Sequence, residues 1–244
     1  MPGTNVNCSF SQEQPEPVED DFTEIMNEFH WKDKFAEEDV LELPVTQYGK
    51  EIKLRAYRYP PKEYRKAVVF YIHGYGSHAS ANGALAKVLA AKNYEVFAID
   101  QRGFGHSDGI RGVIEEKSHV YDDQWLLIFE AIKKFKINQQ KTPLFLFGRS
   151  FGGLLATNMA TGPVASSMFT GACVLTPYYR CWTEKLYENH NLINFLDKVH
   201  PTYVAPSEFQ DPSPEWMAKW GETLKDDVFV SKFTARSASM WIEE

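Results

Sequence analysis

Four short apolar runs, separated by longer stretches of mixed composition, most constrain how this chain can fold. The runs are Ala67–Ile72, Tyr94–Asp100, Pro143–Phe147 and Gly171–Thr176. A run that is almost continuously apolar suits a strand buried on both faces of a parallel sheet. Strands that alternate with helices predict βαβ units, and therefore an α/β fold with a doubly wound, mostly parallel sheet.

The stretches between the runs have the periodicity of helices. One helix is predicted around Leu85, Val88 and Leu89, a second over about Val120–Lys136, and a third over Phe151–Ala160. The expected buried stripe of the second helix is Tyr121, Trp125, Ile128, Ile132 and Phe135. Before the first run, Leu41–Thr46 and Ile52–Tyr57 predict a β-hairpin that turns around Tyr48–Lys50.

The 244 residues divide into three predicted parts. Residues 1–36 are rich in Asp and Glu, which predicts a disordered tail, with a regulatory or docking role as the alternative. Residues 37–180 form the α/β core. Residues 181–244 contain the amphipathic stripe Leu192, Phe195, Leu196 and Val199, which predicts a helical cap or, equally, a plain structural satellite.

Composition narrows the partners and the location. The net charge of −7 argues against a nucleic-acid partner, because phosphate binding needs a basic face. No secretory signal and no apolar stretch long enough to span a membrane is found in the sequence. Cys8, Cys173 and Cys181 lack disulfide or metal spacing, which favours a cytoplasmic protein, and the apolar surroundings of Cys173 predict a buried residue.

The segment Gly148–Gly153 (Gly-Arg-Ser-Phe-Gly-Gly) matches the pattern G-x-S-x-G. It follows an apolar strand and opens a helix, which is where a nucleophilic serine occupies a strained strand-to-helix turn. The free N–H groups and the dipole at the start of that helix favour a developing negative charge. A bare match to this pattern also occurs by chance, but the strand before it and the helix after it make Ser150 the predicted nucleophile.

A second motif, His73–Gly76 (His-Gly-Tyr-Gly), ends the first apolar run. A loop at that position supplies half of an oxyanion hole in serine hydrolases of this architecture. The predicted donors are the backbone N–H groups of Tyr75 and Phe151. His73 precedes the serine, against the expected chain order of Ser, Asp, His, so we expect it to brace the loop.

Together with Asp100–Ser107 (Asp-Gln-Arg-Gly-Phe-Gly-His-Ser), these two motifs resemble the monoglyceride lipase and lysophospholipase branch of the α/β-hydrolases, which includes serine aminopeptidase-like hydrolases. The resemblance covers about Val40 to the C-terminus and implies an α/β-hydrolase fold with a helical cap. In that branch the Asp100–Ser107 loop is structural, so Asp100 and Arg102 are not expected to be catalytic. A dinucleotide site is not expected either, because Asp108 stands where a third glycine is needed.

The resemblance also implies two further strands, which would present the aspartate and histidine of the catalytic triad. No such strand is found after Ser150 outside the cap, so the final strands are expected to be missing. Only His190 and His200 follow Ser150, both within the cap, and neither is expected to be the triad base.

Three hypotheses follow. The first is a serine esterase that cleaves acyl esters of lipids such as monoacylglycerols or lysophospholipids, here in a C-terminally truncated chain that lacks the triad acid and base. The second is a non-catalytic, hydrolase-like binding protein. The third is an assembly in which another polypeptide supplies the missing strands. No metal or organic cofactor is expected, since a serine nucleophile needs only a base. Peripheral membrane contact through the cap, and self-association through an open sheet edge, are further expectations.

Overall fold

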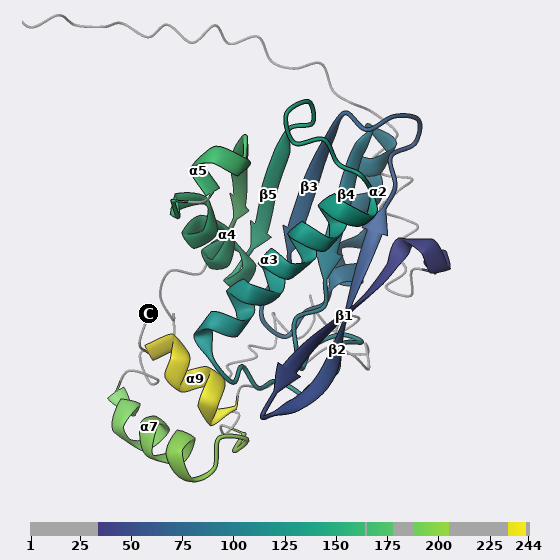
Figure 1. Ribbon diagram of the computed structural model, residues 1–244. Coiled ribbons are helices and arrows are strands. Elements are labelled where there is room, and N and C mark those ends of the chain that lie inside the picture. Colours follow the sequence, from purple (N-terminus) through teal and green to yellow (C-terminus); the bar gives the residue numbers. More distant parts are fainter. Residues whose placement is uncertain (1–33, 164, 178–187, 205–233, 243–244) are drawn as a thin grey trace, which may run out of the picture.

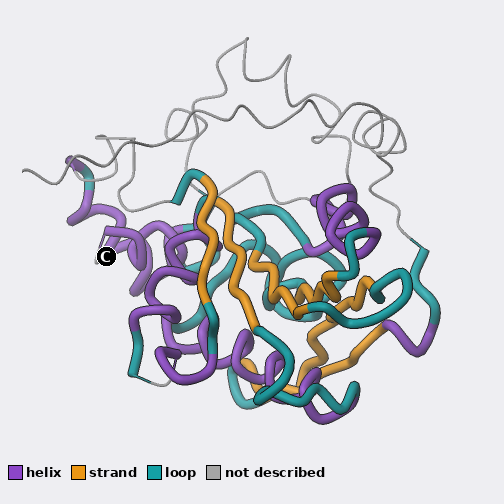
Figure 2. Tube along the Cα trace, turned by 90° about the horizontal axis from the view of Figure 1, so that it is seen from above, coloured by secondary structure: helices purple, strands orange, loops and turns teal. Residues whose placement is uncertain are grey.

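The computed structural model describes residues 34–163, 165–177, 188–204 and 234–242. At its centre is a sheet with helices on both sides (Figures 1 and 2). The strands are β1 (Val40–Gln47), β2 (Lys50–Tyr59), β3 (Ala67–Ile72), β4 (Tyr94–Ile99), β5 (Leu144–Arg149) and β6 (Gly171–Leu175). The helices are η1 (Glu37–Asp39), η2 (Ala79–Asn82), α2 (Gly83–Ala91), α3 (Lys117–Lys134), α4 (Phe151–Thr161), α5 (Ala165–Met168), α7 (His190–Val199) and α9 (Ala235–Ile242).

The strand order is β1-β2-β4-β3-β5-β6, with parallel pairing from β4 to β6 and antiparallel pairing between β1, β2 and β4. The predicted doubly wound, mostly parallel sheet with an N-terminal hairpin is therefore confirmed. The carboxyl ends of β3 and β5 lie next to each other, because Ile72 pairs with Gly148. The loops that follow these two strands carry the predicted site.

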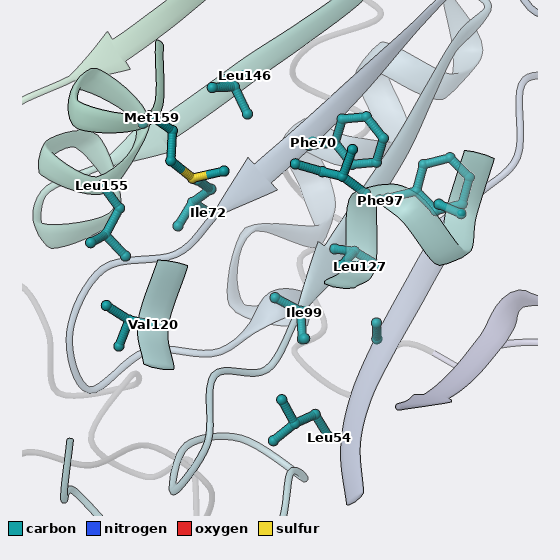
Figure 3. Close-up of a cluster of buried hydrophobic side chains, with 14 of the residues drawn as sticks. Leu54, Phe70, Ile72, Phe97, Ile99, Val120, Leu127, Leu146, Leu155 and Met159 are labelled. Carbon is teal, nitrogen blue, oxygen red and sulfur yellow. The ribbon is translucent and has the colours of Figure 1, made fainter. Parts of the chain in front are cut away.

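Helices α3 and α4 cover one face of the sheet, and α2 covers the other (Figure 1). On the first face, Phe70 and Phe97 lie near Leu127 of α3, while Ile72 lies near Leu155 of α4 (Figure 3). On the second face, alternate residues of β3 and β4 pack against Ala86 and Ala90 of α2. All six residues of β3 are buried, as a strand covered on both faces requires.

The buried faces of two helices differ from the predicted stripes. In α2, Ala84, Ala86 and Ala90 are buried, whereas Leu85, Val88 and Leu89 are partly exposed. In α3, Tyr121 and Trp125 are also partly exposed. The buried residues of α3 are Val120, Asp123, Gln124, Leu127, Ile128 and Ala131. The predicted stripe of α3 is therefore right in part, since Ile128 is buried and Tyr121, Trp125, Ile132 and Phe135 are partly buried and pack against the core. It missed Asp123 and Gln124, because a pattern based on hydrophobicity does not expect polar residues to face the core.

Strand β6 lies at one edge of the described sheet, and its residues from Ala172 to Leu175 are exposed. The prediction that Cys173 is buried is therefore wrong: its thiol is free and exposed. No described element packs over this strand on the side away from β5.

Helices α7 and α9 pack against each other at one end of the molecule (Figure 1). Of the predicted apolar stripe of α7, Leu192, Phe195 and Val199 are 51%, 59% and 59% exposed, and the buried residue is Ile193. The rest of the predicted cap, and the predicted acidic tail before residue 34, lie outside the described residues.

Candidate active site

Ser150 lies in the turn between β5 and α4 with an unusual backbone conformation. Its dihedral angles are φ 54° and ψ −122°. A positive φ is uncommon for a residue that carries a Cβ, and such strained residues cluster at functional sites. The geometry is that of the predicted turn, in which a nucleophile stands at the carboxyl edge of the sheet.

Two glycines on either side of Ser150 make this turn possible. A Cβ on Gly148 would lie 2.1 Å from the carbonyl oxygen of Gly152, and a Cβ on Gly152 would lie 2.1 Å from the carbonyl oxygen of Ile72. Both contacts are with backbone atoms, which cannot move aside cheaply. The G-x-S-x-G pattern is therefore a packing requirement, because β3, β5 and α4 approach one another more closely than any side chain permits.

Backbone hydrogen bonds hold Ser150 from both sides. Its N–H donates to the carbonyl of Leu175 at 3.0 Å, which ties it to the end of β6. Its own carbonyl accepts from the N–H groups of Gly153 at 2.8 Å and Leu154 at 3.2 Å, which closes the first turn of α4. Ser150 is thus fixed by two strands and a helix.

The loop after β3 lies directly beside Ser150. A Cβ on Gly74 would be 3.2 Å from the Cβ of Ser150 and 3.7 Å from its Oγ. The ring of Tyr75 contacts the ring of Phe151 edge to face, with centroids 6.4 Å apart. The structure therefore brings together the two peptide segments that carry the predicted oxyanion donors, while the roles of the Tyr75 and Phe151 N–H groups stay predictions.

His73 is buried beneath this loop. Its Nε2 accepts a hydrogen bond from the N–H of Gln101 at 3.1 Å, so the ring proton is on Nδ1, which donates to the carbonyl of Gly74 at 2.8 Å. Burial lowers the pKa of His73 to about 4, so the ring is neutral near pH 7. Because Gly74 C=O and Tyr75 N–H belong to the same peptide group, this bond fixes the direction of the predicted donor.

Asp100 organises the loop that follows β4. Its fully buried carboxylate accepts hydrogen bonds from the N–H groups of Ala79 at 2.6 Å and His106 at 2.7 Å. Burial alone raises the pKa of a carboxyl group, but the hydrogen bonds from His106 and Ala79 outweigh it and hold the pKa of Asp100 below its usual value. A Cβ on Gly105 would lie 2.3 Å from this carboxylate. These contacts hold the loop in place, and the family resemblance likewise implies a structural role for it.

Arg102 and Asp123 form a buried ion pair between this loop and α3. Their side chains are 3% and 1% exposed and make two parallel hydrogen bonds, and Arg102 also donates to the carbonyl of Thr46. A planar bidentate pair of this kind fixes orientation as well as distance. The sequence pattern gave no indication of Asp123, because an aspartate within an amphipathic helix is normally exposed.

Neither candidate histidine contacts Ser150. His190 and His200 lie at the two ends of α7 and are exposed, and the side chain of His200 contacts Thr202 and Tyr203. Within the described residues, no histidine or carboxylate is hydrogen-bonded to the Oγ of Ser150. The structure assigns no triad acid or base to this part of the chain.

The described residues contain no group of three or more His, Cys, Asp or Glu side chains arranged to hold a metal ion. Among the helices of the same residues, none is both long and apolar enough to cross a membrane.

Several curated proteins are similar in sequence to this chain, and two of them show the extent of the similarity. The chain is 31% identical over 169 residues to a Schizosaccharomyces pombe protein to which monoglyceride lipase activity is ascribed, covering 68% of this chain and 44% of that protein. It is 32% identical over 112 residues to human monoglyceride lipase, covering 46% of this chain and 35% of the human protein. The chain thus spans less than half the length of these relatives.

Solved structures share the fold. A soluble variant of monoglyceride lipase from Saccharomyces cerevisiae, in complex with a substrate analog, superposes with a TM-score of 0.65 at 20% identity over 88% of this chain and 70% of the other. A carboxyl esterase from Bacillus coagulans gives a TM-score of 0.62 at 15% identity, covering 84% and 71%. At such low identity, the likeness establishes the α/β-hydrolase fold and nothing finer.

The family model described as "Serine aminopeptidase, S33" matches residues 63–238, which is more than half of the chain and includes β3, β5 and α4. The chain therefore belongs to the serine aminopeptidase S33 family of α/β-hydrolases.

Proposed function

We propose that this protein is a serine hydrolase that cleaves acyl esters of lipids such as monoacylglycerols or lysophospholipids. The observation that carries the proposal is the conformation of Ser150, whose φ of 54° is maintained between glycines that admit no side chain. A strained serine at the start of a helix, at the carboxyl edge of a parallel sheet, has the geometry of a nucleophile.

The proposed reaction has two steps. The Oγ of Ser150 attacks the ester carbonyl carbon, and the N–H groups of Tyr75 and Phe151 stabilise the negative charge on the carbonyl oxygen. The general base takes the hydroxyl proton of Ser150 during the attack and passes it to the departing alcohol, and water then hydrolyses the acyl-serine. The acid and base of the triad come from outside the described residues.

The substrate class is supported by two independent observations. Relatives of this chain include human monoglyceride lipase, and the solved Saccharomyces cerevisiae lipase has the same fold. The exposed apolar residues of α7 are also suited to an acyl chain.

A binding protein without turnover is the second candidate, because no described histidine is hydrogen-bonded to the Oγ of Ser150.

A fluorophosphonate probe tests the proposal, with the site of modification identified by mass spectrometry. The Oγ–P bond forms as the P–F bond breaks, and the hydroxyl proton passes to a base. We expect label on Ser150 alone when imidazole is supplied as an external base, and no label on the Ser150→Ala variant. Label on another serine with Ser150 unmodified would overturn the assignment. Retained monoacylglycerol binding without any label would favour the binding protein.

We also propose peripheral membrane contact through α7. Leu192, Phe195 and Val199 recur at positions i, i+3 and i+7 and are more than half exposed, as in helices that lie in a bilayer interface. Flotation with phosphatidylcholine vesicles tests this, and Phe195→Ser is expected to weaken binding. Tyr64→Ser, at another aromatic residue that is 61% exposed, is the matched control. Equal binding by both variants would contradict the proposal.

Self-association through β6 is a further proposal. Val174 and Leu175 are 37% and 48% exposed on a strand that has one described neighbour. Such an edge is a template for pairing with another chain.

Two further features are proposed. The chain divides into residues 1–36, 37–180 and 181–244, and the cysteine pattern suggests a cytoplasmic location.

A further inference from the structure

Three hydroxyl groups lie within hydrogen-bond distance of the carbonyl oxygen of Gly112. The Tyr75 hydroxyl lies 2.8 Å from it, the Ser237 hydroxyl 2.8 Å and the Thr234 hydroxyl 3.0 Å. Ser237 and Thr234 are buried, although more than 120 residues separate them from Gly112 in the sequence. A carbonyl oxygen has two lone pairs, so the three hydroxyl groups fill its acceptor capacity, and the Thr234 hydroxyl can also donate to the Ser237 oxygen at 3.1 Å.

Tyr75 is held at both ends. Its hydroxyl is anchored on Gly112, and the carbonyl of the preceding Gly74 is held by His73. Between these two anchors, its ring packs edge to face on Phe104 at 5.0 Å and on Phe151 at 6.4 Å. The position of the Tyr75 peptide therefore depends on where the Gly112 carbonyl lies.

Gly112 is itself held by the core and by the α9 segment. On the core side, its N–H donates to the carbonyl of Gly103 at 3.1 Å. On the other side, Ser237 both contacts the Gly112 carbonyl and accepts from the N–H of Ile114 at 3.2 Å, which clamps residues 112–114. Removing the Ser237 hydroxyl would break both of these contacts and leave a buried N–H without its partner.

We propose that Ser237 and Thr234 are positioning residues for the oxyanion hole, acting through the Gly112 carbonyl on which Tyr75 is anchored. The inference rests on the proposed function for its chemical consequence, but the physical link from α9 to the Tyr75 loop can be measured separately. It assigns to the α9 segment a role in transition-state stabilisation, although this segment contacts no reacting atom.

Matched variants test the link between the α9 segment and the Tyr75 loop. Thr234→Val removes a hydroxyl and keeps the shape, whereas Thr234→Ser keeps the hydroxyl. Ser237→Ala removes the second hydroxyl. Ser239→Ala is the control, because Ser239 lies on the same helix and is buried, but its hydroxyl contacts Asp197 and the carbonyl of Arg236 and not the core loop.

The first measurement is hydrogen exchange of the 244-residue chain by mass spectrometry. We expect Ser237→Ala and Thr234→Val to speed exchange in both residues 110–114 and residues 73–77, while Thr234→Ser and Ser239→Ala leave residues 73–77 unchanged. If the variants speed exchange in residues 110–114 but not in residues 73–77, the proposal is overturned, whether or not Ser150 is reactive.

The second measurement is the saturation kinetics of fluorophosphonate labelling at Ser150, with imidazole added as an external base. We expect Ser237→Ala to lower the maximal labelling rate about tenfold with an unchanged half-saturation concentration, less than the 10²–10³ lost when a donor is removed outright. An unchanged maximal rate would contradict the proposal. Failure of the wild-type chain to label would instead contradict the proposed function, and hydrogen exchange would still decide the link.

Discussion

Gly74 and Ser150 meet across the carboxyl ends of β3 and β5, where a Cβ on Gly74 would lie 3.2 Å from the Cβ of Ser150 and 3.3 Å from the carbonyl of Arg149. These distances are slightly shorter than ordinary contacts, so Gly74→Ala should fold but displace Ser150 by a few tenths of an ångström. We expect fluorophosphonate labelling of Ser150 to slow roughly tenfold, since small misplacements of reacting groups are costly. Unchanged labelling kinetics would show that the loop carrying Gly74 moves instead and leaves Ser150 in place.

Gly152→Ala should be far more damaging. The new Cβ would lie 2.1 Å from the carbonyl of Ile72 and 2.6 Å from that of His73, and neither backbone group can move without shifting β3. We expect a loss of about 3 kcal/mol or more in the free energy of unfolding, measured by urea denaturation. Gly171→Ala is the control, because its Cβ would meet the Phe145 ring at an ordinary 3.7 Å. Equal stability of the two variants would contradict the packing argument.

The buried ring of His73 makes stability depend on pH. Its pKa falls from 6.5 to about 4 on folding, so the unfolded chain binds more protons between these values. The contribution of His73 to the free energy of unfolding is therefore complete above about pH 6.5 and is lost as pH falls toward 4. Its total is on the order of 3 kcal/mol.

His73→Asn tests this, because its amide can still donate to Gly74 but does not titrate. We expect the unfolding free energy of the wild-type chain, but not of the variant, to fall steeply between pH 6.5 and 4, apart from the shared acid loss due to Asp100. Parallel pH profiles for the two proteins would refute a neutral, buried His73.

A polypeptide of these 244 residues should hydrolyse monoacylglycerols very slowly. Loss of the base of a serine triad lowers the rate about a million-fold, while the oxyanion hole and binding leave only about a 10³–10⁴ advantage over water. Added imidazole is expected to raise the rate in proportion to its concentration. Rapid turnover without imidazole would mean that His190 or His200 acts as the base, and changing each to alanine would identify which.

Val174→Lys should reduce self-association through β6. A lysine on an edge strand opposes pairing with a second chain, since two such edges would bring like charges together. Sedimentation velocity is expected to show less oligomer than for the wild-type chain. Ile110→Lys, at a residue 42% exposed outside the sheet, is the control. An identical distribution for all three proteins would rule out this edge.

Much of the fold was predictable because its signals are local. The continuous apolar run of β3 and the G-x-S-x-G pattern each depend on neighbouring residues, and both correspond to what the structure shows around Ile72 and Ser150. The prediction for Cys173 failed because burial depends on neighbouring strands, which the composition of β6 does not reveal.

The remaining site residues were not predictable for the same reason. Asp123 is recognisable only once Arg102 is placed opposite it. Ser237 and Thr234 carry no pattern at all, and their contact with Gly112 joins parts of the chain separated by more than 120 residues. Long-range hydrogen bonds between small polar side chains leave no periodicity in a sequence.

The order of these elements along the chain has a consequence during synthesis. The contacts that shape Ser150 through Gly148 and Gly152 form within β3 to α4, between Ala67 and Thr161, whereas α9 begins only at Ala235. At 5–20 residues per second, a ribosome needs roughly 4–15 s to make the intervening stretch. The nascent chain would therefore contain an ordered Ser150 before the Tyr75 loop is anchored through Gly112. It would pass through a stage in which the proposed nucleophile is formed but weakly reactive.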